Sequence, residues 1–173
     1  MSTAARIRAL ADEKAIYRQM CRYIQAVDRC DLKLLKSVFH PDGVVEFGLF
    51  DGNTMAFCDW DIPFIRDNLQ MGWHRIANVD IRLDGDHAVA ESYMLGNAAA
   101  ALPPEHGGGL INCPDGLRYH DVWVRRDGVW RMSSRKLIMD WNACWAYTER
   151  PMAAFRRGSR DPSDPAYALG LHH

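Results

Sequence analysis

The spacing of the apolar residues changes once along this chain, from the period of a helix to the period of a strand. Between residues 12 and 28, apolar side chains recur every three or four positions, which predicts an amphipathic helix. They are Ile16, Met20, Ile24 and Val27. After residue 76, apolar and polar residues alternate instead, which predicts strands with one buried face. Helices followed by antiparallel strands are the pattern of an α+β fold.

The predicted strands are joined by short turns. Asp-Gly sequences at 84–86 and 127–128 predict two hairpins. The strands that they join run over 76–83, 88–96, 117–126 and 129–140. The stretch 103–116 is rich in Pro and Gly and is expected to be a loop. We expect a curved sheet of four to six strands around the first long helix, which leaves a conical cavity for a small apolar molecule.

Two shorter helices are predicted in the first half of the chain. Asp31 is expected to cap a helix over 31–39. Pro63 is expected in the first turn of a helix over 61–69, where its missing N–H costs nothing. Between these helices the sequence predicts a turn at 40–43 and a strand at 44–47.

Composition excludes several classes of function. The 173 residues are enough for one domain, and 21 Lys and Arg balance 22 Asp and Glu. The net charge of -1 disfavours nucleic acid and anionic membrane as partners. The chain has neither a bilayer-length apolar stretch nor the apolar run of a signal peptide. Motifs for dinucleotides, nucleoside triphosphates and zinc peptidases are absent, so no cofactor and no metal is expected.

The five cysteines indicate a reducing environment. Their number is odd, and no two of them form a C-x-x-C pair. In a chain of this length, that pattern favours free thiols over a disulfide framework. We therefore expect all five cysteines to be reduced and the protein to be cytoplasmic.

Three polar residues are candidates for chemistry. Asp28 continues the buried stripe of the first helix, so its carboxylate either faces the core or only ends the helix. His74 is either a satisfied core or surface group or, when paired with a buried carboxylate, a general base near neutral pH. Tyr23 is either packed core or a hydrogen-bond donor to a developing oxyanion.

Five other side chains are expected to bind substrate. Asn97 and Tyr119 lie at strand positions from which a side chain reaches a pocket, and Asn97 is an amide that stabilises charge or a leaving group. Phe50, Trp60 and Trp73 are aromatic residues that are expected to form part of the pocket wall.

Three segments resemble the SnoaL-like branch of the nuclear transport factor 2-like superfamily. They are R-Y-I-Q-A-V-D-R-C-D-L-K-L-L-K-S-V-F-H-P-D at 22–42, W-H-R-I-A-N-V-D-I-R-L-D-G-D at 73–86 and R-Y-H-D-V-W-V-R-R-D-G-V-W-R at 118–131. The resemblance covers residues 10–141 approximately. It implies the cone-shaped, cystatin-like α+β barrel of that superfamily, with helices packed into a strongly curved, mostly antiparallel sheet.

Within the superfamily the chain is similar to the cofactor-independent lyases, namely bile-acid 7-alpha-dehydratase, scytalone dehydratase and hexachlorocyclohexane dehydrochlorinase. The resemblance implies that His74 removes a proton, that Asp28 supports it and that Tyr23 assists. The implied reaction is a β-elimination of water or halide, or a carbon–carbon cleavage with loss of formaldehyde. The implied substrate is a small hydrophobic cyclic or aromatic compound, with hydroxylated aromatics and steroids as the first to try.

The resemblance leaves the proton donor and the exact reaction open. Where the relatives carry an acidic or histidine side chain, this chain has Gly96 and Asn97, so no general acid is identified. An isomerase or polyketide cyclase of the same fold is one alternative. A non-catalytic structural subunit of a ring-hydroxylating dioxygenase, or a ligand-binding protein, is another.

The resemblance also implies how the chain is organised. Residues 1–141 are expected to form one SnoaL-like domain. Residues 142–173 are expected to be a C-terminal extension that serves as a pocket lid or an interface arm. We expect a homo-oligomer, with a trimer favoured over a dimer, and a small hydrophobic molecule as the ligand.

Overall fold

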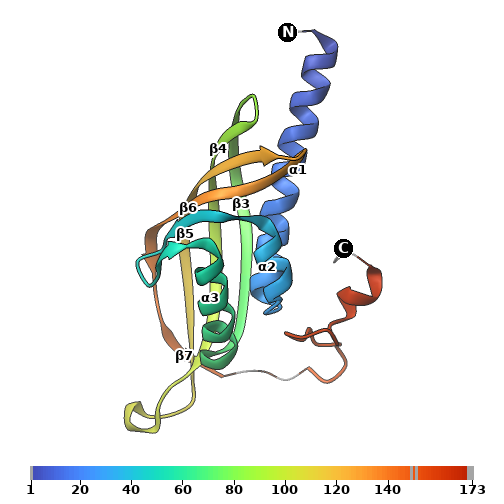
Figure 1. Cartoon of the computed structure of the whole chain (residues 1–173). Helices are drawn as coiled ribbons and strands as arrows, with labels where there is room; N and C mark the ends of the chain where they lie inside the picture. The colour runs from blue at the N-terminus through green and yellow to red at the C-terminus, as the bar shows by residue number, and fades with distance from the viewer. Residues whose placement is uncertain (1, 149, 151, 171–173) are drawn as a thin grey trace.

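The computed structural model describes residues 2–148, 150 and 152–170, which form three α-helices beside one curved sheet (Figure 1). The helices are α1 (Thr3–Asp28), α2 (Leu32–Val38) and α3 (Thr54–Asn68). The strands are β1 (Phe39–Glu46), β2 (Asp51–Asn53), β3 (Leu69–Asp84), β4 (His87–Ala101), β5 (Leu110–Arg126), β6 (Val129–Asn142) and β7 (Trp145–Tyr147). Short 3-10 helices lie at Pro104–His106 and Pro165–Leu169. The α+β class predicted from the change of period is confirmed.

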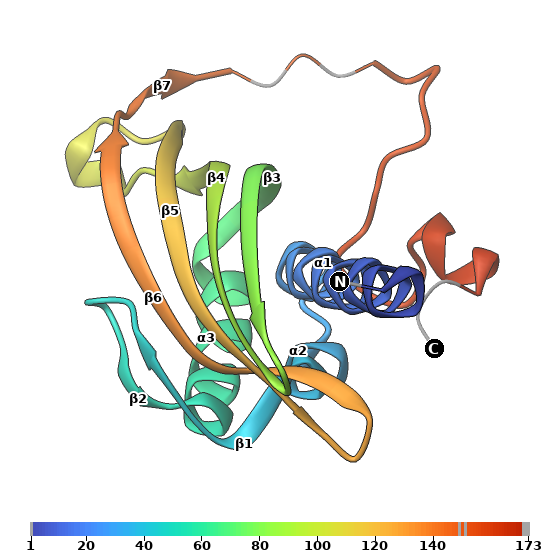
Figure 2. The ribbon, with the colours of Figure 1, turned by 90° about the horizontal axis from the view of Figure 1, so that it is seen from above.

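The sheet is mixed and strongly bent. Its strand order is β2-β1-β6-β5-β4-β3, and β7 pairs with the beginning of β5. Strands β1 and β6 are parallel, whereas the other neighbours are antiparallel. Figure 2 shows the sheet bending around α3, with α1 alongside β3. The expected four to six strands were too few, because β2 and β7 are three residues long and show no visible period.

The core lies between the inner face of the sheet and the buried faces of the helices. Helix α1 contributes Ile16 and Met20, and α3 contributes Phe57. Trp123 on β5 and Met132 on β6 meet them from the sheet, and all five side chains are fully buried. Burial of such a side chain stabilises the fold by about 1.5–3 kcal/mol relative to exposure. The concave face of the sheet is therefore the side on which any internal site is built.

Both long helices begin earlier than the sequence pattern indicates. Helix α1 starts at Thr3, and its first turns are exposed, so no buried stripe marks them. Helix α3 starts at Thr54, because the Asn53 side chain accepts hydrogen bonds from the backbone N–H groups of Met55 and Ala56. Pro63 therefore lies inside α3, and the prediction that it stands in the first turn was wrong.

Several strands also extend beyond their predicted limits. Strand β3 begins at Leu69, so His74 lies inside a strand rather than before one. Strand β5 begins at Leu110, within the expected loop, and β1 includes the expected turn at 40–43 as an irregularity. The alanine-rich end of β4, which pairs with the start of β3 and of β5, has no apolar–polar alternation to reveal this pairing.

The predicted cap of α2 and both predicted hairpin turns are confirmed. Asp31 caps α2, since its carboxylate accepts a hydrogen bond from the backbone N–H of Leu34 at 2.9 Å. Asp127 and Gly128, at the second hairpin, have φ values of 52° and 76°. Two consecutive residues with positive φ are what a tight type I′ hairpin requires.

In the described residues, no helix combines the length and the apolar composition needed to cross a membrane.

Candidate active site

Asp28 and His74 are in direct contact on the inner side of the sheet. The Oδ1 atom of Asp28 lies 2.6 Å from Nδ1 of His74, and Oδ2 accepts a hydrogen bond from the His74 backbone N–H at 3.3 Å. About a fifth of each side chain is exposed, 20% for Asp28 and 21% for His74. A carboxylate bonded to Nδ1 orients the ring and directs Nε2 toward proton transfer.

The end of α1 explains how Asp28 reaches the strand. The helix stops at Asp28, and Cys30 takes a left-handed backbone conformation with a φ of 54°. The chain reverses there, and Asp31 rather than Asp28 caps the next helix. The Asp28 carboxylate is therefore not used as a cap, and it faces β3, which packs against α1.

A row of three residues crosses the sheet at His74. In register, His74 on β3 pairs with Gly96 on β4, and Gly96 pairs with Asp115 on β5. A Cβ atom at Gly96 would collide with the Asp115 carboxyl, so glycine is what lets that carboxyl lie over the middle strand. Burial raises the pKa of Asp115, and the nearby His74 opposes this rise. Within the part of the chain that the structure describes, the buried Oδ1 of Asp115 has no hydrogen-bond partner.

A second carboxyl, on α3, lies within electrostatic reach of the same histidine. Asp61 belongs to the buried stripe of α3, together with Phe57, Cys58, Ile62 and Ile65. Only 8% of Asp61 is exposed, and its Oδ2 atom has no hydrogen-bond partner among the described residues. Burial raises the pKa of Asp61 to about 7, with the charge of His74 acting in the opposite direction.

Asp61 was not among the candidate residues predicted from the sequence. Once α3 is known to start at Thr54, Asp61 falls four and three positions after Phe57 and Cys58, on the apolar face of the helix. A carboxyl within an apolar stripe is unusual, and this position is the sequence signal that marks Asp61. It was hidden because Asp61 was placed at the beginning of the helix, where an acidic residue needs no explanation.

Asp61 makes the stability of the fold depend on pH. Its folded-state pKa of about 7 lies above the ordinary 3.8, so ionisation is penalised in the folded state and the stability falls as the pH rises between these values. We expect Asp61→Asn to gain stability relative to the wild type between about pH 4 and about pH 8, by at most about 4 kcal/mol. Urea unfolding at both pH values measures the gain.

The control for this measurement is Asp59→Asn. Asp59 lies on the same helix but is exposed and pairs with Lys36 at 2.6 Å. Its substitution is expected to change the free energy of unfolding by about 1 kcal/mol or less at both pH values. An Asp61→Asn variant whose stability, relative to the wild type, stays constant across the pH range would contradict the assigned pKa.

Tyr23 and Tyr119 lie deep in the cone beside a buried ion pair. The Arg135 guanidinium is 4.2 Å from the ring of Tyr23 and 3.9 Å from the ring of Tyr119. It donates two hydrogen bonds to Asp121, at 2.8 and 2.7 Å, and neither side chain of this pair is exposed. Burial raises the pKa of both tyrosines. Their hydroxyls therefore stay protonated and are available as hydrogen-bond donors.

Phe50 and Trp60 form an aromatic wall on the same side as Tyr119. Their ring centroids are 5.5 Å apart. Phe47 connects this pair to the interior, since its ring lies 6.1 Å from that of Tyr119 and Phe57 lies between Phe47 and Phe50. The structure thus brings three of the five predicted binding residues, Tyr119, Phe50 and Trp60, into one aromatic cluster.

Trp73 and Asn97 do not face the dyad. Successive residues of a strand point to opposite faces, and these two pair with each other one position away from the His74–Gly96 pair. Trp73 is half exposed beneath the Arg75 guanidinium. The side chains of Trp73 and Asn97 therefore lie on the face of the sheet opposite to His74, and the expected start of the strand after His74 did not show this for Trp73.

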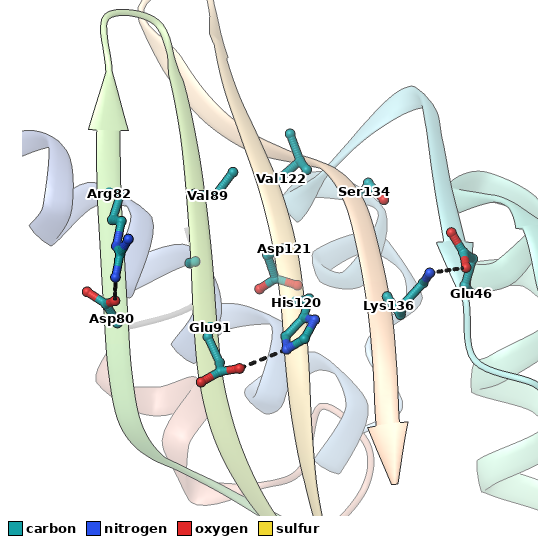
Figure 3. Close-up of a pocket in the computed structure, with 11 residues that line it drawn as sticks. Glu46, Asp80, Arg82, Val89, Glu91, His120, Asp121, Val122, Ser134 and Lys136 are labelled. Atoms are coloured by element: carbon teal, nitrogen blue, oxygen red, sulfur yellow. Dashed lines mark hydrogen bonds and ion pairs between the residues drawn. The ribbon is translucent and has the colours of Figure 1, made fainter.

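The outer face of the sheet carries a shallow groove of about 590 Å³ that is separate from the dyad (Figure 3). Its charged side chains pair with one another: Arg82 with Asp80 at 3.2 Å, His120 with Glu91 at 2.8 Å and Lys136 with Glu46 at 2.7 Å. Because these side chains are already paired with one another, we take the dyad and not this groove as the candidate site.

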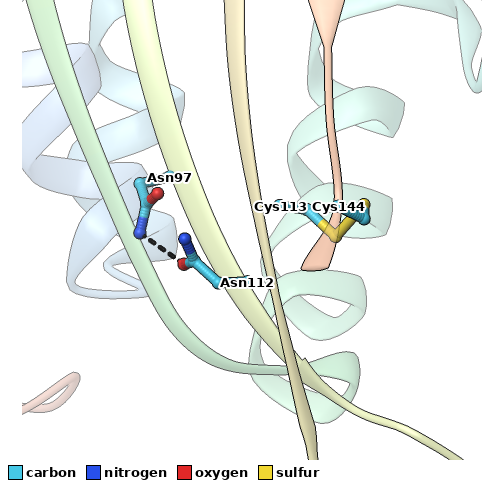
Figure 4. The surroundings of a disulfide bond; sticks show 4 residues. All are labelled: Asn97, Asn112, Cys113 and Cys144. Atoms are coloured by element: carbon cyan, nitrogen blue, oxygen red, sulfur yellow. Dashed lines mark hydrogen bonds between the residues drawn. A yellow bond between two sulfur atoms is a disulfide. The ribbon is translucent and has the colours of Figure 1, made fainter. Parts of the chain in front are cut away.

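The side-chain amide of Asn97 forms a hydrogen bond on this outer side of the sheet. It donates a hydrogen bond to the Oδ1 atom of Asn112 on β5 at 2.8 Å (Figure 4). In register Asn97 pairs with Pro114 and Asn112 pairs with Ala99, so the two amides are diagonal neighbours across β4 and β5. Asn97 therefore joins two strands instead of reaching a leaving group.

The C-terminal residues return to the end of α1. Cys113 and Cys144 form a disulfide that precedes β7, so the expectation of five reduced cysteines was wrong for these two (Figure 4). The two cysteines are 31 positions apart in the chain, so their spacing does not predict the bond. They meet because the chain returns along β6 and β7 pairs with β5. Further on, Arg160 donates to the backbone carbonyls of Ile65 and Leu69, and Tyr167 donates to Asp31 at 3.1 Å. The tail thus contacts the segment that follows Asp28.

Metal ligation has no visible basis in this site. In residues 2–148, 150 and 152–170, no three His, Cys, Asp or Glu side chains gather in an arrangement that could hold a metal ion.

Comparison with known proteins matches residues 8–136 to a family model described as a SnoaL-like domain. A scytalone dehydratase-like protein from Novosphingobium aromaticivorans DSM 12444 has 20% identity and a TM-score of 0.68, over 82% of this chain and 91% of that chain. A hexachlorocyclohexane dehydrochlorinase of type 2 has 16% identity and a TM-score of 0.71, over 86% of this chain and 99% of that chain.

A third similar solved structure is described as having a cystatin-like fold. It is a protein of unknown function with a cystatin-like fold from Nostoc punctiforme PCC 73102, with 16% identity and a TM-score of 0.60, over 75% of this chain and 92% of that chain. At these identities the likeness shows the fold alone, and the predicted cystatin-like cone is confirmed. No curated protein matches the chain.

Proposed function

The chain belongs to the SnoaL-like domain family, and on this premise we propose that it is a cofactor-independent lyase. The observation that carries the proposal is the 2.6 Å contact between His74 and Asp28 on the inner face of the cone. The substrate is a small hydrophobic cyclic or aromatic compound, in keeping with the aromatic wall of Phe50 and Trp60.

The reaction begins with proton abstraction by His74. Its Nε2 atom takes a proton from a substrate carbon, while Asp28 holds the ring and stabilises the imidazolium that forms. The electron pair of the broken C–H bond forms a double bond, and the leaving group departs from the adjacent carbon. The Tyr23 hydroxyl donates a hydrogen bond to the negative charge that develops on the substrate. The half-buried position of the dyad strengthens these interactions.

The names of the two enzymes with similar folds support an elimination. One is a dehydratase-like protein and the other a dehydrochlorinase, so both names denote the loss of a small molecule from a substrate. Identities of 20% and 16% do not show that this chain catalyses the same reactions. The elimination reaction is therefore part of the proposal.

The test is a product screen in heavy water. Hydroxylated and halogenated aromatic, alicyclic and steroid ketones are incubated with the protein, and the products are analysed by mass spectrometry. A lyase lowers the substrate mass by the eliminated molecule. An isomerase or cyclase keeps the heavy-atom composition and incorporates deuterium, and a non-catalytic ligand-binding protein or structural subunit does neither. Either of the last two results would replace the lyase proposal.

A further inference from the structure

The proposed elimination requires a group that protonates a departing oxygen, and we propose that Asp61 on α3 is that catalytic group. In this role the Asp61 carboxylic acid donates its proton to a hydroxyl leaving group, which makes the substrate a hydroxylated compound. The inference rests on the proposed function, because donor and base act on the same substrate. It supplies the acid that neither Gly96 nor Asn97 provides.

The position of Asp61 on α3 places its carboxyl in the interior of the protein. It lies in the stripe that packs into the curve of the sheet, with only 8% of the residue exposed. Its Oδ2 atom has no hydrogen-bond partner among the described residues. An unpartnered polar atom in the interior costs about 1–3 kcal/mol, so such a position is explained best by a partner that arrives with the substrate.

The groups that act electrostatically with Asp61 come from several elements. They are Tyr23 on α1, His74 on β3, Tyr119 on β5 and Cys58 on α3 itself. Arg135, on β6, lies against the two tyrosine rings.

Asp61 is the strongest neutral acid of this group. Burial raises the pKa values of both tyrosines, and it raises the pKa of Cys58 to about 12, so these groups release a proton reluctantly. The pKa of about 7 for Asp61 leaves the carboxyl protonated in much of the protein at neutral pH, yet acidic enough to donate.

The proposed step balances in protons and electrons. His74 takes the proton of the C–H bond, the C–H electrons form the new double bond, and the adjacent C–O bond breaks. The departing oxygen takes the Asp61 proton and leaves as water. Imidazolium on His74 and carboxylate on Asp61 remain, and transfer of one proton between them through the released water restores both. No oxidant, reductant or further reactant is needed.

The donor role is tested with two probes that share a ring and differ in leaving group. β-Hydroxycyclohexanone must lose hydroxide, which requires protonation, whereas its nitrophenyl ether loses a stable phenolate; both give cyclohexenone. We expect Asp61→Asn to lower water elimination by about 10²-fold or more and to change phenolate elimination by less than about threefold. His74→Gln lowers both reactions, and the exposed control Asp59→Asn lowers neither.

The proton on Asp61 is read directly by infrared spectroscopy. We expect a protonated carboxyl band at neutral pH that disappears in Asp61→Asn and persists in Asp59→Asn. If no such band disappears, the donor role is overturned. It is also overturned if Asp61→Asn affects both probes equally, or if Asp115→Asn and not Asp61→Asn abolishes water elimination. A wild-type protein that eliminates neither probe and gives no eliminated product in the product screen overturns the proposed function itself, which distinguishes the two failures.

Discussion

Replacement of His74 by alanine is expected to lower the rate of elimination by at least about 10²-fold, and by as much as about 10⁴-fold, because a positioned general base contributes in this range. Asp28→Asn is expected to reduce kcat as well, because the carboxylate sets the orientation of the imidazole and stabilises its positive charge. Steady-state kinetics with the first substrate found in the product screen measures both effects.

His120→Ala is the matched control for this experiment. His120 also contacts a carboxylate, with its Nε2 atom 2.8 Å from Glu91, but this pair lies on the outer face of the sheet. Its substitution is expected to leave kcat within about threefold of the wild type. Turnover close to the wild-type rate in His74→Ala would remove the dyad from the mechanism.

Asp121→Asn is expected to reduce the free energy of unfolding by about 3–5 kcal/mol, because it leaves a buried guanidinium without its counter-charge. Arg135 is entirely buried; burial lowers the pKa of its guanidinium, but the charge of Asp121, its hydrogen bond and the two tyrosines together raise it. The rings of Tyr23 and Tyr119 contact the guanidinium but carry no negative charge to replace that of Asp121. Urea denaturation, analysed by linear extrapolation, gives the change.

The Arg118–Asp140 pair provides the comparison for this stability loss. It joins the same two strands with the same residue types, and Arg118 also donates more than one hydrogen bond to the carboxylate. These side chains are 28% and 38% exposed, so Asp140→Asn is expected to cost about 1 kcal/mol or less. Equal losses in Asp121→Asn and Asp140→Asn would show that burial does not set the energy of the inner pair.

The candidate dyad illustrates how far a sequence leads toward a site. The stripe of the first helix places Asp28 on a buried face, and that face is a local property of the sequence. The contact with His74 spans 46 positions in the chain, and spacing alone does not predict it. The family resemblance suggested the pair, and the structure brings the two side chains together; their catalytic role stays a prediction.

The misplaced residues share one physical cause. Which face of an element a side chain occupies depends on where the element begins. An error in the start of β3 put Trp73 in the pocket, and an error in the start of α3 put Asp61 at a helix end. The start of β3 is set by its pairing with β4, and the start of α3 is set by the cap at Asn53. Neither of these is part of the local apolar pattern.

The sequence by itself determined the α+β class, the buried stripe of α1, the cap at Asp31 and the two hairpin turns. These features depend on period and turn chemistry, which act over a few neighbouring residues. Only the tertiary structure decided that the Asp61 carboxyl is buried without a hydrogen-bond partner for Oδ2 among the described residues, and that Cys113 meets Cys144. The bending of the sheet around α3 and the return of the chain along β5 create these encounters, and both arise from packing between distant segments.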